Sequence, residues 1–157
     1  MTPMASAAPS PKFATTSADP VPLVYADSSA LVKLVRPEPE TDALRADLKG
    51  ADLVSSELVL AEVPRALQRI AAADPRLPLR PALHRAGELI QVLALYPVDR
   101  PLLLGAGALA EPALRTLDAI HVASAVELGP VDAFVTYDER QAAAARLAGL
   151  RTTSPGV

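Results

Sequence analysis

The stretch from Val21 to Leu34 constrains the fold of this chain more than any other. An apolar run from Val21 to Ala26 ends in Asp27 and two serines, and an amphipathic run begins at Ala30. Parallel strands that are buried on both faces are apolar without alternation. The pattern therefore predicts a buried strand, an acidic turn and a helix, with Asp27 at the carboxyl end of the strand.

Asp27 has two interpretations at this point. Ligands of open α/β sheets bind in the crevice outside the carboxyl ends of the strands, so an acid there is a candidate for chemistry. Asp and Ser are also preferred helix N-caps, so Asp27 or Ser28 can simply begin the helix. If other acids reach the same crevice, capping suits Ser28 or Ser29 better, and Asp27 is left for chemistry.

The rest of the chain alternates between strand and helix patterns. Further strands are predicted over residues 51–55, 95–98, 132–136 and 150–152, and helices over 30–35, 39–49, 57–73, 81–92, 101–110, 116–128 and 138–148. Strands that alternate with helices form a parallel sheet with helices on both faces. We therefore expect a three-layer α/β/α domain with a central parallel sheet.

Three local signals predict where helices begin or bend. Ser55 or Ser56 is placed to cap the helix over residues 57–73. Pro64 removes a backbone donor within that helix, which predicts a kink or a helix start near it. Thr136 and Glu139 have the spacing of a capping box for the helix over residues 138–148.

Composition excludes several classes of protein. The chain has 157 residues, enough for one domain with a real core, and it has no cysteine, which excludes thiolate chemistry and cysteine zinc sites. A net charge of −3 argues against a generally basic surface, and aromatic residues at 3% leave few platforms for stacking bases. Any contact with nucleic acid must be local.

Two features of the sequence bear on where the protein is located. Residues 1–20 are rich in Ala, Pro, Ser and Thr, so we expect a disordered lead before a domain over residues 21–155. The lead lacks the basic start and apolar core of a secretory signal. No apolar stretch reaches the ~18 residues of a membrane span, so we expect a cytoplasmic protein without a membrane partner.

Four acids are placed where a doubly wound sheet can bring them together. Asp138 follows a strand as Asp27 does, Asp118 lies in the first turn of the helix over residues 116–128, and Glu62 lies a turn into the helix over residues 57–73. A helix N-terminus alone can account for Asp118. Carboxylates that converge in partial burial repel one another unless a cation is present. Acids without Cys or paired His favour Mg²⁺ or Mn²⁺ over zinc.

Basic and imidazole side chains accompany two of these acids. His121 lies three residues after Asp118, on the same helix face, and is either a substrate contact or a satisfied, half-buried histidine. Arg65 and Arg69 are one helical turn apart and follow Glu62. They can bind phosphates, bind a protein partner or simply form a solvated helix face.

The set of acids resembles that of the PIN-domain ribonucleases, and specifically the VapC-type toxins of bacterial toxin–antitoxin pairs. The matching segments are Y-A-D-S-S-A-L-V-K-L with Asp27, S-S-E-L-V-L-A-E-V-P-R-A-L with Glu62, L-R-T-L-D-A-I-H-V-A-S-A with Asp118 and F-V-T-Y-D-E-R with Asp138. Together they cover residues 21 to about 155. Pro64, two residues after Glu62, departs from the pattern.

The resemblance implies an Mg²⁺- or Mn²⁺-dependent endoribonuclease that cuts RNA with a metal-activated water. It implies that Asp27, Glu62, Asp118 and Asp138 are catalytic and hold the metal directly or through water, with Asp27, Asp118 and Asp138 as the metal ligands. Ser28 and Thr136 would support the site. The resemblance further implies a homodimer and a cognate antitoxin that covers the crevice.

Two other functions remain to be compared. A catalytically inactive PIN-like interaction module would use the acids as helix caps and the apolar segment over residues 102–109 as a partner surface. A receiver-like phosphoacceptor also has an Asp at a strand end, but it needs a neighbouring acidic pair, and Asp27 has none.

Overall fold

The structure is a computed structural model and describes residues 20–157, so the disordered lead predicted over residues 1–20 lies outside the described residues except for Pro20. The five strands in this part are β1 (Leu23–Ala26), β2 (Asp52–Ser56), β3 (Ala94–Tyr96), β4 (Ala133–Val135) and β5 (Thr152–Thr153). The helices are α1 (Ser28–Val35), α2 (Thr41–Asp47), α3 (Val59–Ala73), α4 (Leu79–Gln91), α5 (Arg100–Gly107), α6 (Thr116–Leu128) and α7 (Glu139–Leu147). Within residues 20–157, no helix is both long and apolar enough to cross a membrane.

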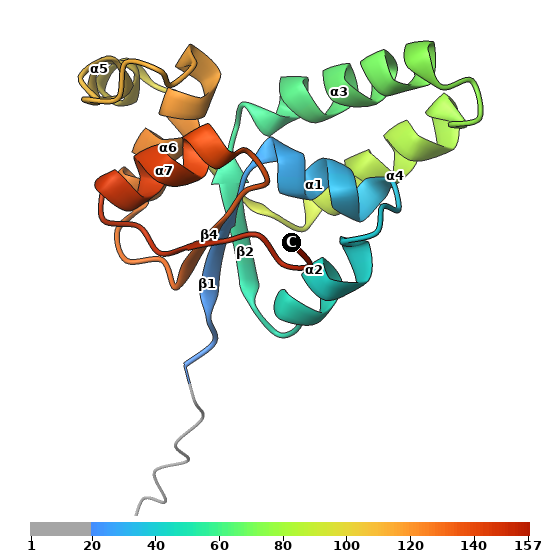
Figure 1. Ribbon diagram of the computed structural model, residues 1–157, viewed down its shortest axis with the longest axis horizontal. Helices are drawn as coiled ribbons and strands as arrows, with labels where there is room; N and C mark the ends of the chain where they lie inside the picture. Colours follow the sequence, from blue (N-terminus) through green and yellow to red (C-terminus); the bar gives the residue numbers. More distant parts are fainter. Residues whose placement is uncertain (1–19) are drawn as a thin grey trace, which may run out of the picture.

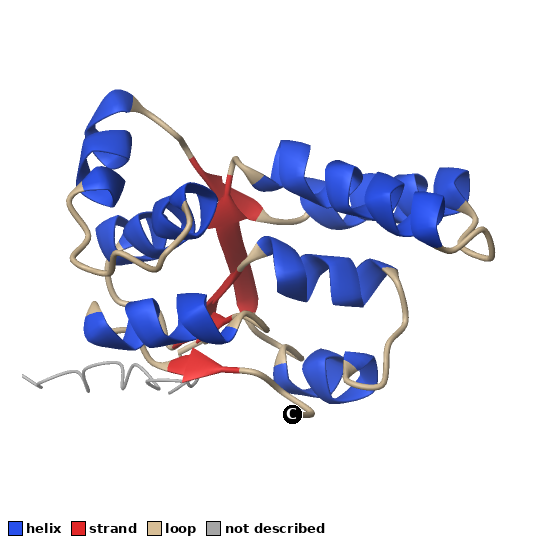
Figure 2. Cartoon of the chain, turned by 45° about the horizontal axis from the view of Figure 1, so that its top comes forward, coloured by secondary structure: helices blue, strands red, loops and turns tan. Residues whose placement is uncertain are grey.

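The strands form one parallel sheet in the order β3-β2-β1-β4-β5. Figure 2 shows the strands in red between the blue helices. β1 is the central strand, and its Val24 lies beside Leu53 of β2 and Ala133 of β4. The chain adds strands on one side of β1 as far as β3, then crosses to the other side for β4 and β5. The strand order therefore reverses between β1 and β4.

Helices cover both faces of the sheet, which confirms the predicted three-layer α/β/α fold (Figure 1). Successive side chains of a strand point to opposite faces. Val24 and Ala26 of β1 accordingly join the core beneath α1 to α4, whereas Tyr25 joins Phe134 of β4 in the core beneath α6 and α7. α5 packs on the outer side of α6 through Leu102.

α3 differs from the prediction at its start. It begins at Val59 without a side-chain cap, because Ser55 and Ser56 are the buried last residues of β2. Ser55 Oγ instead donates a hydrogen bond to the carbonyl of Ala26, at 2.6 Å. The helix continues through Pro64 to Ala73, and its buried side chains hold it against the core on both sides of the proline.

The start of α7 and the last strand also differ from the prediction. Asp138 is the N-cap of α7, and its carboxylate accepts from the backbone nitrogens of Arg140 and Gln141, so the predicted capping box of Thr136 and Glu139 is wrong. β5 begins only at Thr152. Leu150 is still part of the helix end, because its nitrogen donates back to the carbonyl of Ala145.

Candidate active site at the carboxyl edge of the sheet

The crevice of interest lies where the strand order reverses. β1 ends next to β4, and the nitrogen of Asp27 donates to the carbonyl of Val135 at 3.1 Å. The chain leaves β1 into α1 and leaves β4 toward α7, which lie on opposite faces of the sheet (Figure 1). In open α/β sheets, this divergence opens the crevice in which ligands bind.

Asp27 is the most buried acid of the crevice, with 3% of its surface exposed. Oδ1 accepts hydrogen bonds from Ser29 Oγ at 2.6 Å and from the nitrogen of Ala30 at 3.0 Å. Oδ2 accepts from Thr136 Oγ1 at 2.7 Å. Burial raises the pKa of Asp27 above its usual range, although these hydrogen bonds act in the opposite direction.

Asp27 is also the N-cap of α1, so the expectation that Ser28 or Ser29 takes over capping is wrong. The physical reason is that one carboxylate has enough lone pairs for several partners. Oδ1 carries the cap and the Ser29 contact, while Oδ2 has one hydrogen-bond donor. Capping therefore does not prevent Asp27 from binding a cation or a water through Oδ2.

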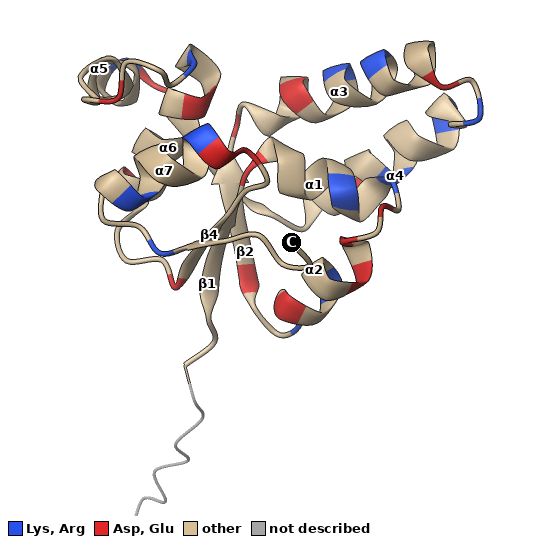
Figure 3. Ribbon diagram, in the orientation of Figure 1, with Lys and Arg blue, Asp and Glu red and all other residues tan. Residues whose placement is uncertain are grey.

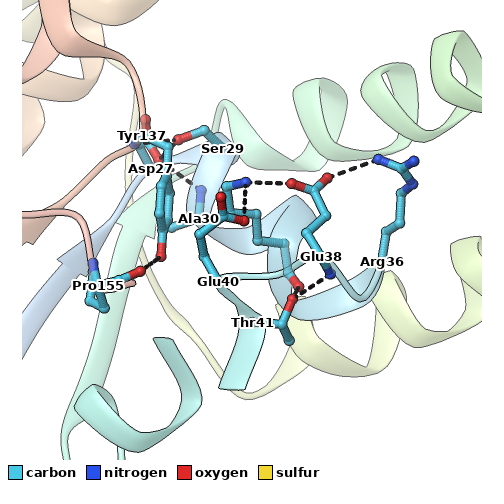
Figure 4. Close-up of polar contacts among 10 residues, drawn as sticks. Asp27, Ser29, Ala30, Arg36, Glu38, Glu40, Thr41, Tyr137 and Pro155 are labelled. Carbon is cyan, nitrogen blue, oxygen red and sulfur yellow. Dashed lines mark hydrogen bonds and ion pairs between the residues drawn. The ribbon is translucent and has the colours of Figure 1, made fainter. Parts of the chain in front are cut away.

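Tyr137 ties the loop after β4 to α1 (Figure 4). Its backbone nitrogen donates to Ser29 Oγ at 3.0 Å, and its hydroxyl donates to the carbonyl of Pro155 at 2.8 Å. Lys33 lies 4.6 Å from the centre of the Tyr137 ring and forms ion pairs with Glu38 and Glu40. These contacts hold the loop that precedes Asp138 against the start of α1.

Glu62 enters the crevice from α3 and is held by a buried histidine of α6. Its Oε2 lies 2.6 Å from His121 Nε2, and His121 Nδ1 lies 2.8 Å from the hydroxyl of Tyr25. His121 is only 1% exposed. With both ring nitrogens occupied by protein groups, His121 is a satisfied core histidine, and its ring does not face the groove as a substrate contact would.

Asp118 is half-buried in the first turn of α6, and no hydrogen bond or ion pair of its carboxylate is found within the described chain. Burial raises the pKa of Asp118, and the charges of Asp138, Asp27 and Glu62 raise it further. Asp138 caps α7 through Oδ1 and leaves Oδ2 without a backbone donor. Asp118 therefore lies close enough to the other three predicted acids to feel the repulsion of their charges.

The chemistry of this donor set fits a hard divalent cation. Its members are carboxylate oxygens whose mutual repulsion a cation relieves, and its neighbours include no sulfur ligand because the chain has no cysteine. Among residues 20–157, however, no three His, Asp or Glu side chains are already placed to hold one ion together. In residues 20–157, these carboxylates thus share one crevice without forming a closed coordination shell.

A groove between α1 and α3 leads into the crevice. Ser28, Glu62, Arg65 and Arg69 line a cavity of about 250 Å³. Ser28 and Arg69 also line the adjoining cavity of about 330 Å³, which extends to Lys33. Figure 3 shows the basic segments along α3, and neither Arg65 nor Arg69 is ion-paired with a carboxylate of the described residues.

Two residues that hold the site together escape sequence reasoning. Ser29, and not Ser28, donates a hydrogen bond to Asp27. The sequence indicates only that a serine follows the acid closely, and it does not distinguish the two adjacent serines. Tyr25 resembles an ordinary core residue of an apolar strand. Its contact with His121 joins residues 96 positions apart, and no local pattern encodes that pairing.

Comparisons with known proteins agree with this fold and crevice. The family model for the PIN domain matches residues 24–147. Ribonuclease VapC46 of Mycobacterium tuberculosis is 44% identical over 134 residues, which cover 84% of this chain and 97% of that protein. Ribonuclease VapC47 of the same species is 36% identical over 140 residues, covering 85% of this chain and 98% of that protein.

Solved structures show the same fold at lower identity. VapC20 of Mycobacterium tuberculosis, described as a Sarcin-Ricin loop cleaving toxin, superposes with a TM-score of 0.61 at 19% identity, covering 77% of this chain and 94% of that one. VapBC2 of Rickettsia felis, bound to a DNA fragment from its promoter, gives 0.62 at 13% identity, covering 83% and 97%.

This chain is a member of the PIN-domain family, as the family model and the parallel sheet with its acidic carboxyl edge both show. Within the family, full-length similarity at 36–44% identity places it among the VapC-type proteins.

Proposed function

We propose that this chain is a metal-dependent endoribonuclease that acts as the toxin of a toxin–antitoxin pair. Residues 21–155 form its nuclease domain. The observation that supports the proposal is the position of Asp118 at the reversal of strand order, where burial and the charges of Asp138, Asp27 and Glu62 raise its pKa. The similarity over nearly full length to proteins named Ribonuclease VapC supports RNA as the substrate.

In this proposal, Asp27, Asp118 and Asp138 bind Mg²⁺ or Mn²⁺, and Glu62 completes the catalytic set. Such an ion, when bound, lowers the pKa of a water for attack on the phosphodiester and neutralises charge on the phosphoryl oxygens. Thr136 donates to Asp27 and keeps its carboxylate turned into the crevice. The same hydrogen bonds leave Oδ2 of Asp27 able to accept a further ligand.

Ser28, Arg65 and Arg69 bind the RNA in this proposal. They line the groove between α1 and α3 beside Glu62, so a strand in the groove passes the acids. Guanidinium groups contact phosphate oxygens, and they supply local positive charge that the acidic protein otherwise lacks. Ser28 lies at the first turn of α1 and can orient a phosphate or a water.

Cleavage by an Asp27→Asn variant tests the proposal. Asparagine is as good an N-cap as aspartate and keeps the cap of α1, but it removes the negative charge. With Mg²⁺ or Mn²⁺, we expect the wild-type protein to cut RNA and Asp27→Asn to lose at least about 100-fold, a loss of the size seen when acid–base or metal groups are removed. Asp42→Asn on the exposed start of α2, at 99% side-chain exposure, is the matched control.

Unchanged cleavage by Asp27→Asn would reject the assignment. An inactive interaction module is the alternative, and it gains support from the capping by Asp27 and Asp138. Capping does not account for Glu62 or Asp118, because neither side chain caps a helix. Calorimetric titration with Mn²⁺ separates the two, since only the nuclease requires a binding site for the ion.

The remaining parts of the proposal concern partners and location. We propose a homodimer with a cognate antitoxin that covers the crevice, in the cytoplasm where the RNA substrate is found. Leu103 and Leu104 of α5 support an interface because both are exposed, Leu104 at 67%. The other face of the same helix is part of the core, at Leu102 and Ala106. Light scattering that gives a monomer mass would contradict the dimer.

A further inference from the structure

A row of three hydrogen-bonded polar side chains runs from the sheet to the crevice, and two of the three, Tyr25 and His121, have no part in the function proposed above. It begins at Tyr25 in the middle of β1, passes through His121 in α6 and ends at Glu62 in α3. Tyr25 and His121 are 0% and 1% exposed, whereas Glu62 lines the groove. This row of side chains therefore links the buried interior of the domain to a side chain that a substrate can reach.

Each ring nitrogen of His121 can donate or accept, so the direction of these hydrogen bonds is assigned from the chemistry of their partners. A tyrosine hydroxyl, with an ordinary pKa of about 10, carries its proton at neutral pH and can donate it to His121 Nδ1. An imidazole that accepts at Nδ1 carries its own proton on Nε2. Nε2 then donates to Glu62 Oε2, at 2.6 Å. The tyrosine thus selects the histidine tautomer that can bind a carboxylate.

Packing leaves this arrangement little freedom. The Tyr25 ring stacks on Phe134 with 5.1 Å between ring centres and 6° between planes, and it meets the His121 ring edge-on at 5.9 Å. His121 lies within the run of buried residues on α6. Glu62 on the groove wall is in this way held through two buried, closely packed rings.

We infer that Tyr25 and His121 are positioning residues that hold the carboxylate of Glu62 in its working orientation in the crevice. The inference rests on the proposed ribonuclease function. Within the described residues, His121 is the one hydrogen-bond partner of the Glu62 side chain, and Oε1 has none. α6 also carries Asp118 one turn before His121. The same helix therefore positions two of the four acids, Asp118 directly and Glu62 through His121.

Tyr25→Phe is the sharpest variant, because it keeps the stacked ring and removes only the hydroxyl. Partners that orient a functional side chain typically contribute 10- to 100-fold, so we expect kcat for RNA cleavage to fall by about that factor with KM unchanged. His121→Gln retains an N–H donor near the place of Nε2 and should retain more activity than His121→Leu. Equal loss in the two His121 variants would contradict the role of the donor.

A double-mutant cycle separates positioning from a general effect on packing. If Tyr25 acts through Glu62, adding Tyr25→Phe to Glu62→Gln should cause no further loss of kcat. A further loss equal to that of Tyr25→Phe alone would overturn the inference. The cycle requires a measurable rate of cleavage by Glu62→Gln, so the assay must use enough enzyme to detect that rate.

A second measurement needs neither metal nor substrate. The ring nitrogens of His121 can be observed by NMR in the metal-free protein, with His84→Gln as the background that removes the other histidine. In the wild-type protein, we expect the ring proton on Nε2. In Tyr25→Phe, we expect that proton to exchange rapidly or the ring to change its tautomer. A proton on Nδ1 in the wild-type ring would overturn the inference. If the Nε2 proton is found but the wild-type protein cuts no RNA, the proposed function is rejected while the hydrogen bond from His121 to Glu62 is still supported.

Discussion

Asp118 is the residue at which stability and the proposed function oppose each other. Its carboxylate is half-buried, and burial and three neighbouring acids raise its pKa. The folded protein therefore binds the Asp118 proton more tightly than the unfolded chain does. By linkage, the ionised side chain costs stability, and this cost is absent at low pH and grows as the pH rises toward the folded-state pKa.

We predict that Asp118→Asn abolishes RNA cleavage and raises the melting temperature. Without divalent metal at pH 7.5, the rise should be about 1–3 °C, a small value because solvent screens a half-exposed carboxylate. The difference should shrink as the pH falls below the raised folded-state pKa of Asp118 and should vanish below the ordinary Asp pKa of about 3.9. Calorimetric melting with and without Mn²⁺ checks this, since Mn²⁺ should stabilise only the wild-type protein. A lower melting temperature for Asp118→Asn would contradict the linkage.

The acids could be predicted from sequence because each lies at an expected element boundary. Asp27 follows an apolar run, and Asp118 opens a helix with a clear pattern. The hydrogen bonds among side chains could not be predicted, because they depend on distances across the fold. Thr136, assigned to a capping box from its spacing, donates instead to Asp27, 109 residues away. The assignment of the acids to metal binding and catalysis stays a prediction.

At the level of helices and strands, the alternating pattern predicted the five strands of the described sheet and their parallel direction, but not their order. The ends were less predictable, because contacts outside the local sequence set them. Ser55 and Ser56 have the chemistry of helix caps, yet both complete β2 and are buried. Pro64 breaks helices in isolation, whereas the packing of Val63 and Leu67 keeps α3 continuous.

Two glycines on helices allow a matched test of backbone conformation. Gly87 lies on the exposed side of α4 with helical geometry, and Gly129 ends α6 at a φ of 100°, which residues with a Cβ rarely adopt. A Cβ at either position would meet no atom within 4 Å, so sterics with neighbours do not differ. The two sites differ in backbone conformation alone.

We predict opposite effects of the same substitution. Gly87→Ala should stabilise the protein by about 0.5–1 kcal/mol, because glycine loses more conformational entropy in a helix than alanine does. Gly129→Ala should destabilise it by about 1–3 kcal/mol through backbone strain. Urea unfolding measures both values. Equal effects of the two substitutions would show that the conformation of Gly129 is not the cause.

The whole molecule is acidic, yet its proposed substrate is a polyanion. Arg65 and Arg69 resolve this conflict if they bind phosphates in the groove, since they supply positive charge there although the net charge of the chain is −3. Binding through phosphates releases counterions, so affinity falls with salt in proportion to the number of contacts.

We predict that the double variant Arg65→Ala, Arg69→Ala raises KM for RNA and leaves kcat unchanged, because binding is lost equally in ground and transition states. The slope of log affinity against log salt should decrease by about 1.4 for a single-stranded substrate, about 0.7 per phosphate contact. Arg76→Ala is the control, since Arg76 is exposed and paired with Asp74 outside the groove. An unchanged salt slope would assign these arginines to another partner or to solvent.

The central place of β1 has a consequence for the synthesis of this protein. The first strand of the chain pairs with β4, and Asp27 receives its Thr136 hydrogen bond from 109 residues downstream. At about 5–20 residues per second, a ribosome needs about 5–20 s to add that length of chain. During this interval the side of the crevice formed by β1 and α1 has been synthesised, whereas the side formed by β4 and α7 has not. Asp27 and Asp138 therefore cannot come together until translation of the domain is almost complete.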